Sequence, residues 1–288
     1  MNYRTHVGLD EISRRLGDIA PTATTDVPAL GVRVHVATDV APPAPVIFEP
    51  MLYLVFQGAK RILLSDREIS YGPGELVTTA AHIPALAEVV AASDRFPYRA
   101  LEIPFDQQLV TALIAELGEL PSSPAESVAV NPLPRSVLDP VSRLLELAHD
   151  PDAARVLAAG VKREIWYRIL TGPNGGAFVE LTRTHSALGL VHELTQWMHE
   201  HLHEPLDVGR AATHANMSVT SLYRLFKAAT GTSPGSYHKR LRLMEARRRV
   251  VERSDTVGRI AAAVGYASPS QFTRDYRRAF GTSPTADF

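Results

Sequence analysis

The sequence predicts a two-part α+β chain, in which a small β-barrel or double-sheet roll with packed helices precedes an all-helical region. Three observations support this prediction. Short runs of alternating apolar and polar residues, separated by turns rich in glycine and proline, fill residues 30–105. Apolar residues at helical spacing dominate from residue 107 onward. Residues 208–284 contain one short unit twice, which is typical of two supersecondary elements of one design.

The composition excludes several kinds of site. The chain has 288 residues, of which 45% are apolar and 21% are charged, as in a globular protein with room for two domains. It contains no cysteine, which excludes disulfides, thiol nucleophiles, cysteine zinc sites and a methyl-accepting DNA-repair regulator. The sequence shows neither a secretory signal pattern nor an apolar run of membrane-spanning length, so we expect a cytoplasmic protein with no membrane partner.

The small net charge of −1 hides a division along the chain. Residues 181–288 hold 15 Lys and Arg against 9 Asp and Glu, a net charge of +6, which leaves −7 for the residues before them. A basic region joined to an acidic one fits a nucleic-acid-binding domain that carries a separate module.

The first region begins with a helical pattern of apolar residues at Leu9, Ile12, Leu16 and Ile19. Strand-like runs follow at 30–36, 52–57, 61–65, 75–79, 86–91 and 98–105. A small ligand usually binds at the mouth of such a barrel. Candidate ligand contacts there are Tyr53, Gln57 and Tyr98, and a role in the core or on the surface is the alternative for each.

Helical patterns at 107–118, 136–149 and 153–170 come next, with a loop expected at 121–134. Their apolar faces either complete the core of the sheet or form a surface for a partner. The breaker cluster at 172–176 predicts a hinge. We therefore expect one domain over 1–176 and a second over 186–288.

The second domain opens with a helix at 188–203. His199 and His203 near its end lie at i and i+4, a spacing that can bind Zn²⁺. No third protein ligand is evident in the sequence, so we predict no metal and no cofactor.

The repeated unit lies at 208–234 and again at 257–284, and each copy reads as helix, turn, helix, over 208–229 and 257–279. Ser218 and Ser268 are suited to cap the second helix of each copy, and Pro269 fits the first helical position. Gly231 and Gly281 are suited to end these helices because glycine accepts positive φ.

The apolar stripes of these second helices, expected to be buried, run from Leu222 to Ala229 and from Phe272 through Tyr276 to Ala279. The faces opposite them are polar and basic. An exposed helix face of this kind can hydrogen-bond base edges in a major groove. An ordinary solvated surface is the alternative. Candidate base-reading residues are Thr220, Ser221, Arg224, Ser270, Gln271 and Arg274. Candidate phosphate contacts are Ser218, Lys227, Ser268 and Arg277.

The two copies are joined by a long helical pattern at 236–253. Its apolar side holds Tyr237, Leu241, Met244 and Val251, and seven of its residues are Lys or Arg. These cations suit phosphates, or they pair with the acidic residues of the same segment. Such a helix is about 27 Å long, which approaches one duplex turn of about 34 Å. It is suited to hold two reading helices in successive major grooves.

These features resemble the DNA-binding domain of the AraC/XylS family of bacterial transcription regulators. The resemblance covers about residues 189–288 and is carried by MSVTSLYRLFKAATGTSP, YHKRLRLMEAR and VGYASPSQFTRDYRRAFGTSP. It implies two helix–turn–helix units joined by a long helix, with the second helix of each unit inserted into DNA. The base-reading positions above are those that the resemblance carries over.

A second resemblance covers about residues 27–172. The runs FEPMLYLVFQGAKRILL, YGPGELV and ASDRFPYRALEIPFD are similar to the cupin-like N-terminal sensor module of one AraC subgroup. This implies a small-molecule effector and a homodimer. The sheet region has only His35 and His82, well apart, so a metal-dependent cupin enzyme lacks its ligand cluster.

Together these observations predict a sequence-specific transcription regulator, with no catalytic residue, under the control of a small effector. The expected partners are double-stranded DNA, a second copy of the chain, the effector and RNA polymerase, and activation of transcription is the expected action. Two alternatives remain open: a DNA-binding regulator whose first domain only dimerises, and an enzyme built on the cupin-like domain.

Overall fold

The protein is described here from a computed structural model that covers residues 8–64, 67–120, 126–173, 175–183 and 186–288. Its first part is built on antiparallel strands. Those in the described residues are β1 (Thr25–Val27), β2 (Val32–Ala37), β3 (Ala41–Phe48), β4 (Met51–Gln57), β5 (Ala59–Leu63), β6 (Glu68–Tyr71), β7 (Glu75–Thr79), β8 (Ile83–Ala91), β9 (Tyr98–Pro104) and β10 (Val128–Pro132). They form two sheets, in the orders β1-β2-β9-β4-β7-β10 and β3-β8-β5-β6.

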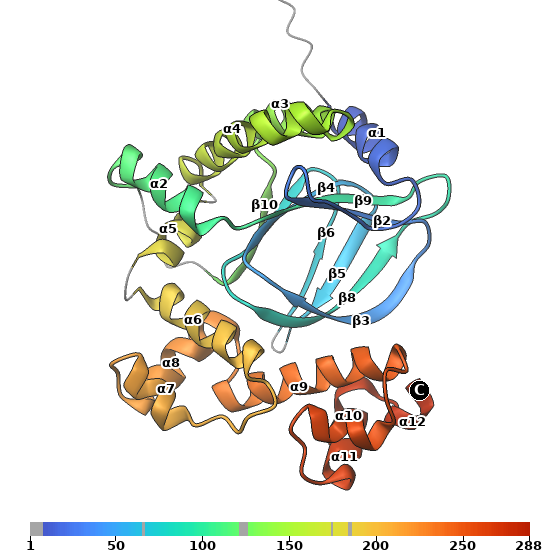
Figure 1. Cartoon of the computed structure of the whole chain (residues 1–288), viewed down its shortest axis with the longest axis vertical. Coiled ribbons are helices and arrows are strands. Elements are labelled where there is room, and N and C mark those ends of the chain that lie inside the picture. Colours follow the sequence, from blue (N-terminus) through green and yellow to red (C-terminus); the bar gives the residue numbers. More distant parts are fainter. Residues whose placement is uncertain (1–7, 65–66, 121–125, 174, 184–185) are drawn as a thin grey trace, which may run out of the picture.

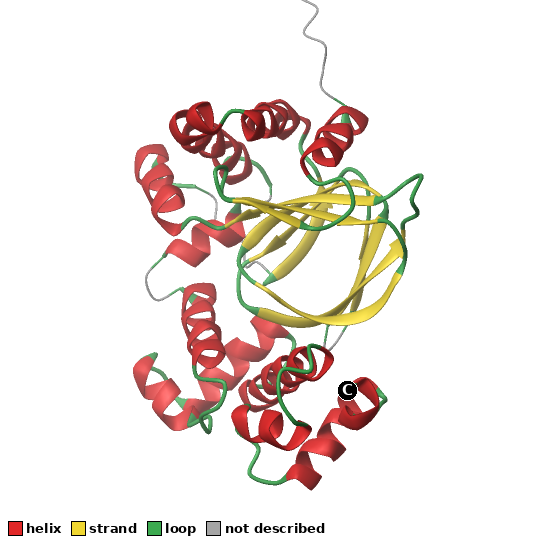
Figure 2. Cartoon of the chain, turned by 45° about the vertical axis from the view of Figure 1, so that its right-hand side comes forward, coloured by secondary structure: helices red, strands yellow, loops and turns green. Residues whose placement is uncertain are grey.

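The two sheets face each other (Figure 2). Each sheet keeps its own edge strands. Of the two predicted forms, a barrel or a double-sheet roll, the structure therefore shows the double-sheet form, which is not closed into a barrel. Side chains alternate along the strands, as the pleat requires. On β2, for example, Val32, Val34 and Val36 are buried under helices, whereas His35 lies on the face toward the other sheet.

Helices cover the outer face of the six-stranded sheet (Figure 1). They are α1 (Leu9–Ile19), α2 (Gln107–Leu117), α3 (Arg135–Glu146) with a 3₁₀ turn at Leu147–His149, α4 (Pro151–Leu170) and α5 (Gly176–Thr182). The rings of Phe105, Trp166 and Phe178 pack against one another within this core, with centroids 4.9–5.8 Å apart. Such aromatic clusters bury a large apolar area and fix the relative positions of the helices that supply them.

Two predicted connections differ from the structure. The loop predicted at 121–134 contains strand β10, which pairs with β7; residues 121–125 lie outside the described residues. The segment predicted as a hinge joins α4 to α5, and both helices pack in one core. A Cβ at Gly175 would lie 2.4 Å from the Leu170 carbonyl oxygen, so the chain is tightly packed at this turn.

Strands β1, β3 and β6 were not predicted from the sequence. β3 contains Pro42, Pro43 and Pro45, which lack the backbone N–H of a ladder. The structure tolerates them because β3 is an edge strand of the four-stranded sheet and needs only one hydrogen-bonded neighbour.

The second part of the chain is helical. It comprises α6 (Ala187–Glu200), α7 (Val208–His214), α8 (Val219–Thr230), α9 (Pro234–Val251), α10 (Val257–Ala263), α11 (Pro269–Phe280) and α12 (Pro284–Asp287). The predicted start and stop signals are confirmed for both repeated units. Ser218 accepts from the Ser221 N–H and Ser268 from the Gln271 N–H, while Gly231 and Gly281 end α8 and α11 at φ values of 74° and 75°. None of the described helices is both long and apolar enough to cross a membrane.

The long helix α9 buries two different sides. Tyr237 and Leu241 in its first half join the core shared by α6, α8 and the four-stranded sheet. Leu243, Ala246 and Val250 in its second half pack against α10 and α11 in a separate cluster. The helix therefore contacts both repeated units through its own apolar residues.

Two predicted core positions are wrong. Val251 was expected on the buried side of α9, but it is 61% exposed while Val250 is fully buried. The reason is that the buried stripe changes side along the helix, where α9 passes from the first unit to the second. Ala279 on α11 is exposed, and Phe280 is half-buried in its place.

Replacing Val250 by alanine should lower the free energy of unfolding by about 2 kcal/mol, because it removes two buried carbons and leaves a cavity. The same change at Val251 should alter it by less than about 0.5 kcal/mol. Chemical denaturation of the two variants beside the wild type measures the difference. Equal effects at the two positions would contradict the observed change of buried side.

Candidate nucleic-acid interface and candidate ligand site

The first candidate reading helix, α8, presents Thr220, Arg224 and Lys227 to solvent, with Leu222 and Phe226 buried behind them. Ser221 is half-buried and takes part in the helix cap: the Ser218 hydroxyl donates to the Ser221 hydroxyl oxygen at 2.9 Å. The sequence thus placed this polar face correctly on the exposed side, but Ser221 is already engaged within the protein.

The second candidate reading helix, α11, repeats this arrangement. Ser270, Gln271, Arg274 and Arg277 are exposed. On the other side of the helix, Phe272 and Tyr276 are buried and their rings are 5.5 Å apart. The hydroxyls of Ser268 and Ser270 lie 2.9 Å apart at the cap.

The cations of the two reading faces differ from those of α9. Within the described residues, the side chains of Arg224, Lys227, Arg274 and Arg277 have no hydrogen-bond or ion-pair partner in the protein. They are therefore available to an external anion. Phosphate oxygens and base edges are both suited to these side chains.

The cations of α9 are mostly occupied within the protein. Lys239 pairs with Asp275 at 2.6 Å and Arg247 with Asp287 at 3.1 Å. Arg248 and Arg249 both pair with Glu245. Pairing within the same segment thus holds for Arg248 and Arg249, whereas Lys239 and Arg247 pair with acidic residues of other helices.

Arg242 of α9 has a structural role that its charge alone does not suggest. Its guanidinium donates to the carbonyl oxygens of Leu202 and Glu204, which follow α6, and to that of Gly265 in the turn of the second unit. Gly265 has φ +84°, and a Cβ there would lie 2.7 Å from the Arg242 guanidinium. Arg242 therefore ties the connection between α6 and α7, and the turn of the second repeated unit, to the helix between the units.

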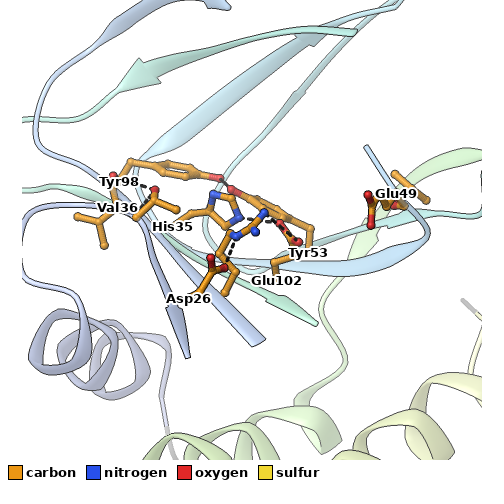
Figure 3. Close-up of polar contacts among 10 residues, drawn as sticks. Asp26, His35, Val36, Glu49, Tyr53, Tyr98 and Glu102 are labelled. Carbon is orange, nitrogen blue, oxygen red and sulfur yellow. Dashed lines mark hydrogen bonds and ion pairs between the residues drawn. The ribbon is translucent and has the colours of Figure 1, made fainter. Parts of the chain in front are cut away.

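Two of the three candidate ligand residues meet inside the first part of the chain. Tyr53 and Tyr98 are almost fully buried between the sheets, and the Tyr98 hydroxyl donates to the Tyr53 hydroxyl at 3.0 Å (Figure 3). Burial raises the pKa of both phenols well above the ordinary value, so both are neutral donors.

Gln57 lies apart from this pair. Its side-chain oxygen accepts from the Ser13 hydroxyl of α1 at 2.7 Å, on the helical side of the sheet. A register shift between Val55 and Gln57 explains its position. An extra residue in a strand reverses the alternation that follows it.

Four further residues of this interior were missed from the sequence: His35, Lys60, Tyr71 and Glu102. His35 Nε2 lies 2.7 Å from Glu102 Oε2, and burial lowers the pKa of His35 (Figure 3). The Lys60 ammonium lies 5.5 Å from the ring centre of Tyr53 and 5.9 Å from that of Tyr98. The two-residue alternation from neighbouring interior positions, such as Ile62 for Lys60, was the signal that could have found them.

A second polar cluster joins the two parts of the chain. The ring of His82, which precedes β8, stacks on those of His192 and His199 from α6, with centroids 5.5 and 5.7 Å apart. The Tyr237 hydroxyl of α9 donates to the His82 carbonyl oxygen. Burial, with the neighbouring imidazoles as a smaller cause, lowers the pKa of His82 and of His192 to about 4.

The structure supports neither of the two metal sites considered from the sequence, one at His199 and His203 and the other at His35 and His82. His199 belongs to this stack, whereas His203 lies 3.9 Å from Glu204. His35 and His82 sit in separate clusters. In the part of the chain that the structure describes, no three His, Cys, Asp or Glu residues are arranged to hold a metal ion.

A small cavity of about 100 Å³ also lies between the two parts of the chain. Arg67, Glu126 and Val128 line it from the sheets, and Lys227 to Gly231 line it from the end of α8. Lys227 thus stands between the exposed face of α8 and the sheet region.

Two family models match the sequence. Residues 28–177, slightly more than half of the chain, match the AraC-type transcriptional regulator N-terminus, and residues 211–287 match a helix-turn-helix domain. The chain is 34% identical over 94 residues to the transcriptional activator RhaS of Pectobacterium carotovorum, which is 33% of this chain and 34% of RhaS. It is 30% identical over 156 residues to the transcriptional regulator ArgR of Pseudomonas aeruginosa, which is 53% of this chain and 45% of ArgR. These alignments therefore span less than half of the curated relatives.

Solved structures share the fold. The chain resembles an apo variant of ToxT from Vibrio cholerae with a TM-score of 0.58 at 11% identity, over 92% of this chain and 98% of ToxT. Wild-type ToxT bound to an unsaturated fatty acid gives a TM-score of 0.58 at 12% identity, over 88% and 93%. The order of a two-sheet region followed by a helical region with two similar units is thus an established architecture.

The histidine cluster predicts a loss of stability in mild acid. The folded-state pKa of His82 and His192 lies below the ordinary value of 6.5, so the folded protein binds these protons less readily than the unfolded chain. The loss of folding stability that these two histidines cause is small above pH 6.5 and grows as the pH falls from 6.5 toward 4. Between pH 7 and pH 5.5 each histidine should cost about 1 kcal/mol of stability.

The measurement is denaturant unfolding at several pH values. A variant with glutamine at both positions, His82→Gln and His192→Gln, should lose less stability over this range than the wild type does. His149→Gln, a change of an exposed histidine in the 3₁₀ turn after α3, serves as the control. Equal acid sensitivity in the double variant and the control would contradict the assignment.

Proposed function

The chain belongs to the AraC family of transcription regulators, and from this membership we propose that it binds specific DNA sequences under the control of a small effector. The observation that carries the proposal is the pair of capped helices, α8 and α11, whose exposed cations have no partner in the described protein. We assign DNA binding to residues 186–288 and effector sensing to residues 1–176. The named relatives are transcription regulators, which supports this function over that of a cupin enzyme.

On DNA, we propose that both reading helices enter the major groove. Thr220 and Arg224 of α8, and Gln271 and Arg274 of α11, would contact base edges. Ser270 shares the face of α11, and Ser221 would contribute only after leaving its cap contact. Lys227 and Arg277, one turn further along, together with the cap residues Ser218 and Ser268, would contact phosphates.

The helix α9 supports this arrangement as a spacer. Its 18 residues span about 27 Å. It is packed against both units along its length, and Arg242 ties it to the connection between α6 and α7 and to the turn of the second unit. A spacer held in this way favours two reading helices with one fixed separation, and hence a bipartite DNA site.

For the effector, we propose the interior between the two sheets, around Tyr53 and Tyr98. A similar fold in ToxT has been described with a bound unsaturated fatty acid, which supports a ligand-responsive architecture. An effector can change DNA binding only if it binds two arrangements of the protein with different affinity. The shared core between the sheets and α6, α8 and α9 is the connection through which this difference would act.

We also propose that two copies of the chain associate through α4. Val156 and Leu157 are exposed by 71% and 52% on this helix, and Tyr167 is 40% exposed further along it. Exposed apolar side chains gathered on one element favour contact with a partner. Contact with RNA polymerase and activation of transcription remain predictions from the family.

If Arg224 and Arg274 contact base edges, replacing either one should lower DNA-binding affinity in a way that depends on the DNA sequence. Once a bound site has been selected from a random DNA library, Arg224→Ala and Arg274→Ala should each weaken binding to it by about 1–3 kcal/mol. Binding to random DNA should change little, because base contacts are lost only on the selected site. Fluorescence anisotropy at fixed salt measures both affinities, with Arg95→Ala in an exposed loop of the sheet region as the control. Equal losses on both DNAs would assign the arginines to phosphates.

Phosphate contact predicts a different result for Lys227→Ala and Arg277→Ala. Each should weaken binding about equally on selected and random DNA, and each should reduce the slope of log K against log salt by about 1. A salt titration of the same two DNAs tests this. An unchanged slope, or a loss confined to the selected site, would show that these side chains do not contact phosphates.

A further inference from the structure

Lys60 is an interior lysine of the sheet region. It lies on β5, opposite Tyr71 of β6 in the strand register, and its ammonium lies over the rings of Tyr53 and Tyr98. The next residue, Arg61, points to the outer face, where it pairs with Glu68 and Glu88. This alternation fixes the Lys60 side chain on the inner face of the sheet.

The charge of Lys60 has no anion beside it. Among the residues that the structure describes, no hydrogen bond or ion pair involves its ammonium. The acidic group that acts on it most, Glu102, is bonded to His35 and lies 3.8 Å from Arg33. Burial lowers the pKa of Lys60 to about 8, so the ammonium is still mostly charged at neutral pH. A half-buried cation without a counter-ion is costly unless something supplies the charge.

A free hydrogen-bond donor lies on the residue opposite Lys60 in the strand register. Tyr71 is 3% exposed, and its hydroxyl is buried with no hydrogen-bond partner among the described residues. The hydroxyls of Tyr53 and Tyr98 already bond each other. Buried polar groups in native proteins are nearly always paired, so an unpaired hydroxyl that faces the same interior as a cation indicates a missing acceptor.

We propose that the effector carries a carboxylate, which the Lys60 ammonium and the Tyr71 hydroxyl bind together. This inference rests on the proposed sensing role of the interior and names the chemical class of its ligand. A carboxylate supplies both the negative charge and the acceptor oxygens that these two groups lack. The rings of Tyr53 and Tyr98 offer an apolar surface to the remainder of the molecule.

The surroundings also indicate how the ligand enters. The side chains of His35 and Glu102 are 19% and 18% exposed, and Lys60 is half-buried, so solvent reaches the interior at this end. The Glu102 carboxylate would repel an anion, but the Arg33 guanidinium, 3.8 Å away, offsets its charge. The site therefore favours a monoanion with an apolar body over a neutral or cationic molecule.

The test compares carboxylates with their uncharged amides on the full-length protein. Butyrate, octanoate and benzoate, each beside its primary amide, are titrated at pH 7 by calorimetry and by thermal unfolding. At least one carboxylate should bind, and at least about 10-fold more tightly than its amide, since the amide lacks the charge. Lys60→Met should weaken that binding by about 10- to 100-fold, and Tyr71→Phe by about 3- to 10-fold. Lys162→Met, a change of a half-buried lysine on α4, serves as the control and should leave the affinity unchanged.

The wild-type protein provides a second test that does not depend on the folding of a variant. Binding of the carboxylate should weaken as the pH rises above about 8, because Lys60 then loses its proton. The proposal is overturned if no carboxylate of the panel binds, if the amide binds equally well, if Lys60→Met binds as the wild type does, or if affinity stays constant to high pH. DNA binding by the ligand-free wild type, measured on the selected site, decides the proposed function separately. A protein that binds DNA but no carboxylate retains the function and loses only this inference.

Discussion

The apolar packing of α9 is the constraint on which the rest of the structure depends. This one helix must fill two cores, with Tyr237 and Leu241 toward the first unit and the sheets and with Leu243 and Val250 toward the second unit. Because the two sets lie on different sides, the second unit is rotated about the helix axis relative to the first. The relative orientation of the two reading helices is therefore set by which residues of α9 are apolar.

The same packing explains how charge is distributed in the helical region. A helix that contacts protein on two sides leaves little free surface, so its cations lie close to acidic residues and carbonyl groups of their own chain. Pairing satisfies charges that would otherwise be poorly solvated. Arg224 and Arg274 lie on helices with one fully exposed face and keep their donors free. Net positive charge therefore indicates the region that we propose to bind DNA, whereas the lack of internal partners indicates which of its side chains are available for contact.

The sequence predicted the features that depend on local chemistry and missed those that depend on strand register. The caps at Ser218 and Ser268 and the left-handed glycines follow from a few neighbouring residues, so two aligned copies were enough to place them. Gln57 was misplaced relative to Tyr53 because a bulge between them reverses the alternation. Lys60 was overlooked because its environment is made by strands distant in sequence: alternation with Ile62 places it on the inner face, but no local pattern places it over Tyr53 and Tyr98.

The interior around Lys60 and the contact with the helical region belong to one packed cluster. Tyr53, Tyr71 and Tyr98 belong to the same buried cluster as Ile83 and Ala85 of β8 and Tyr237 and Leu241 of α9. Close-packed interiors accommodate an added ligand by displacement of neighbours, since they contain little free volume. If the tyrosines are displaced, the next element to be displaced is β8, and β8 in turn contacts α9. An effector between the sheets would therefore alter DNA binding through the position of α9, which both reading helices share, and would act on the two half-sites together.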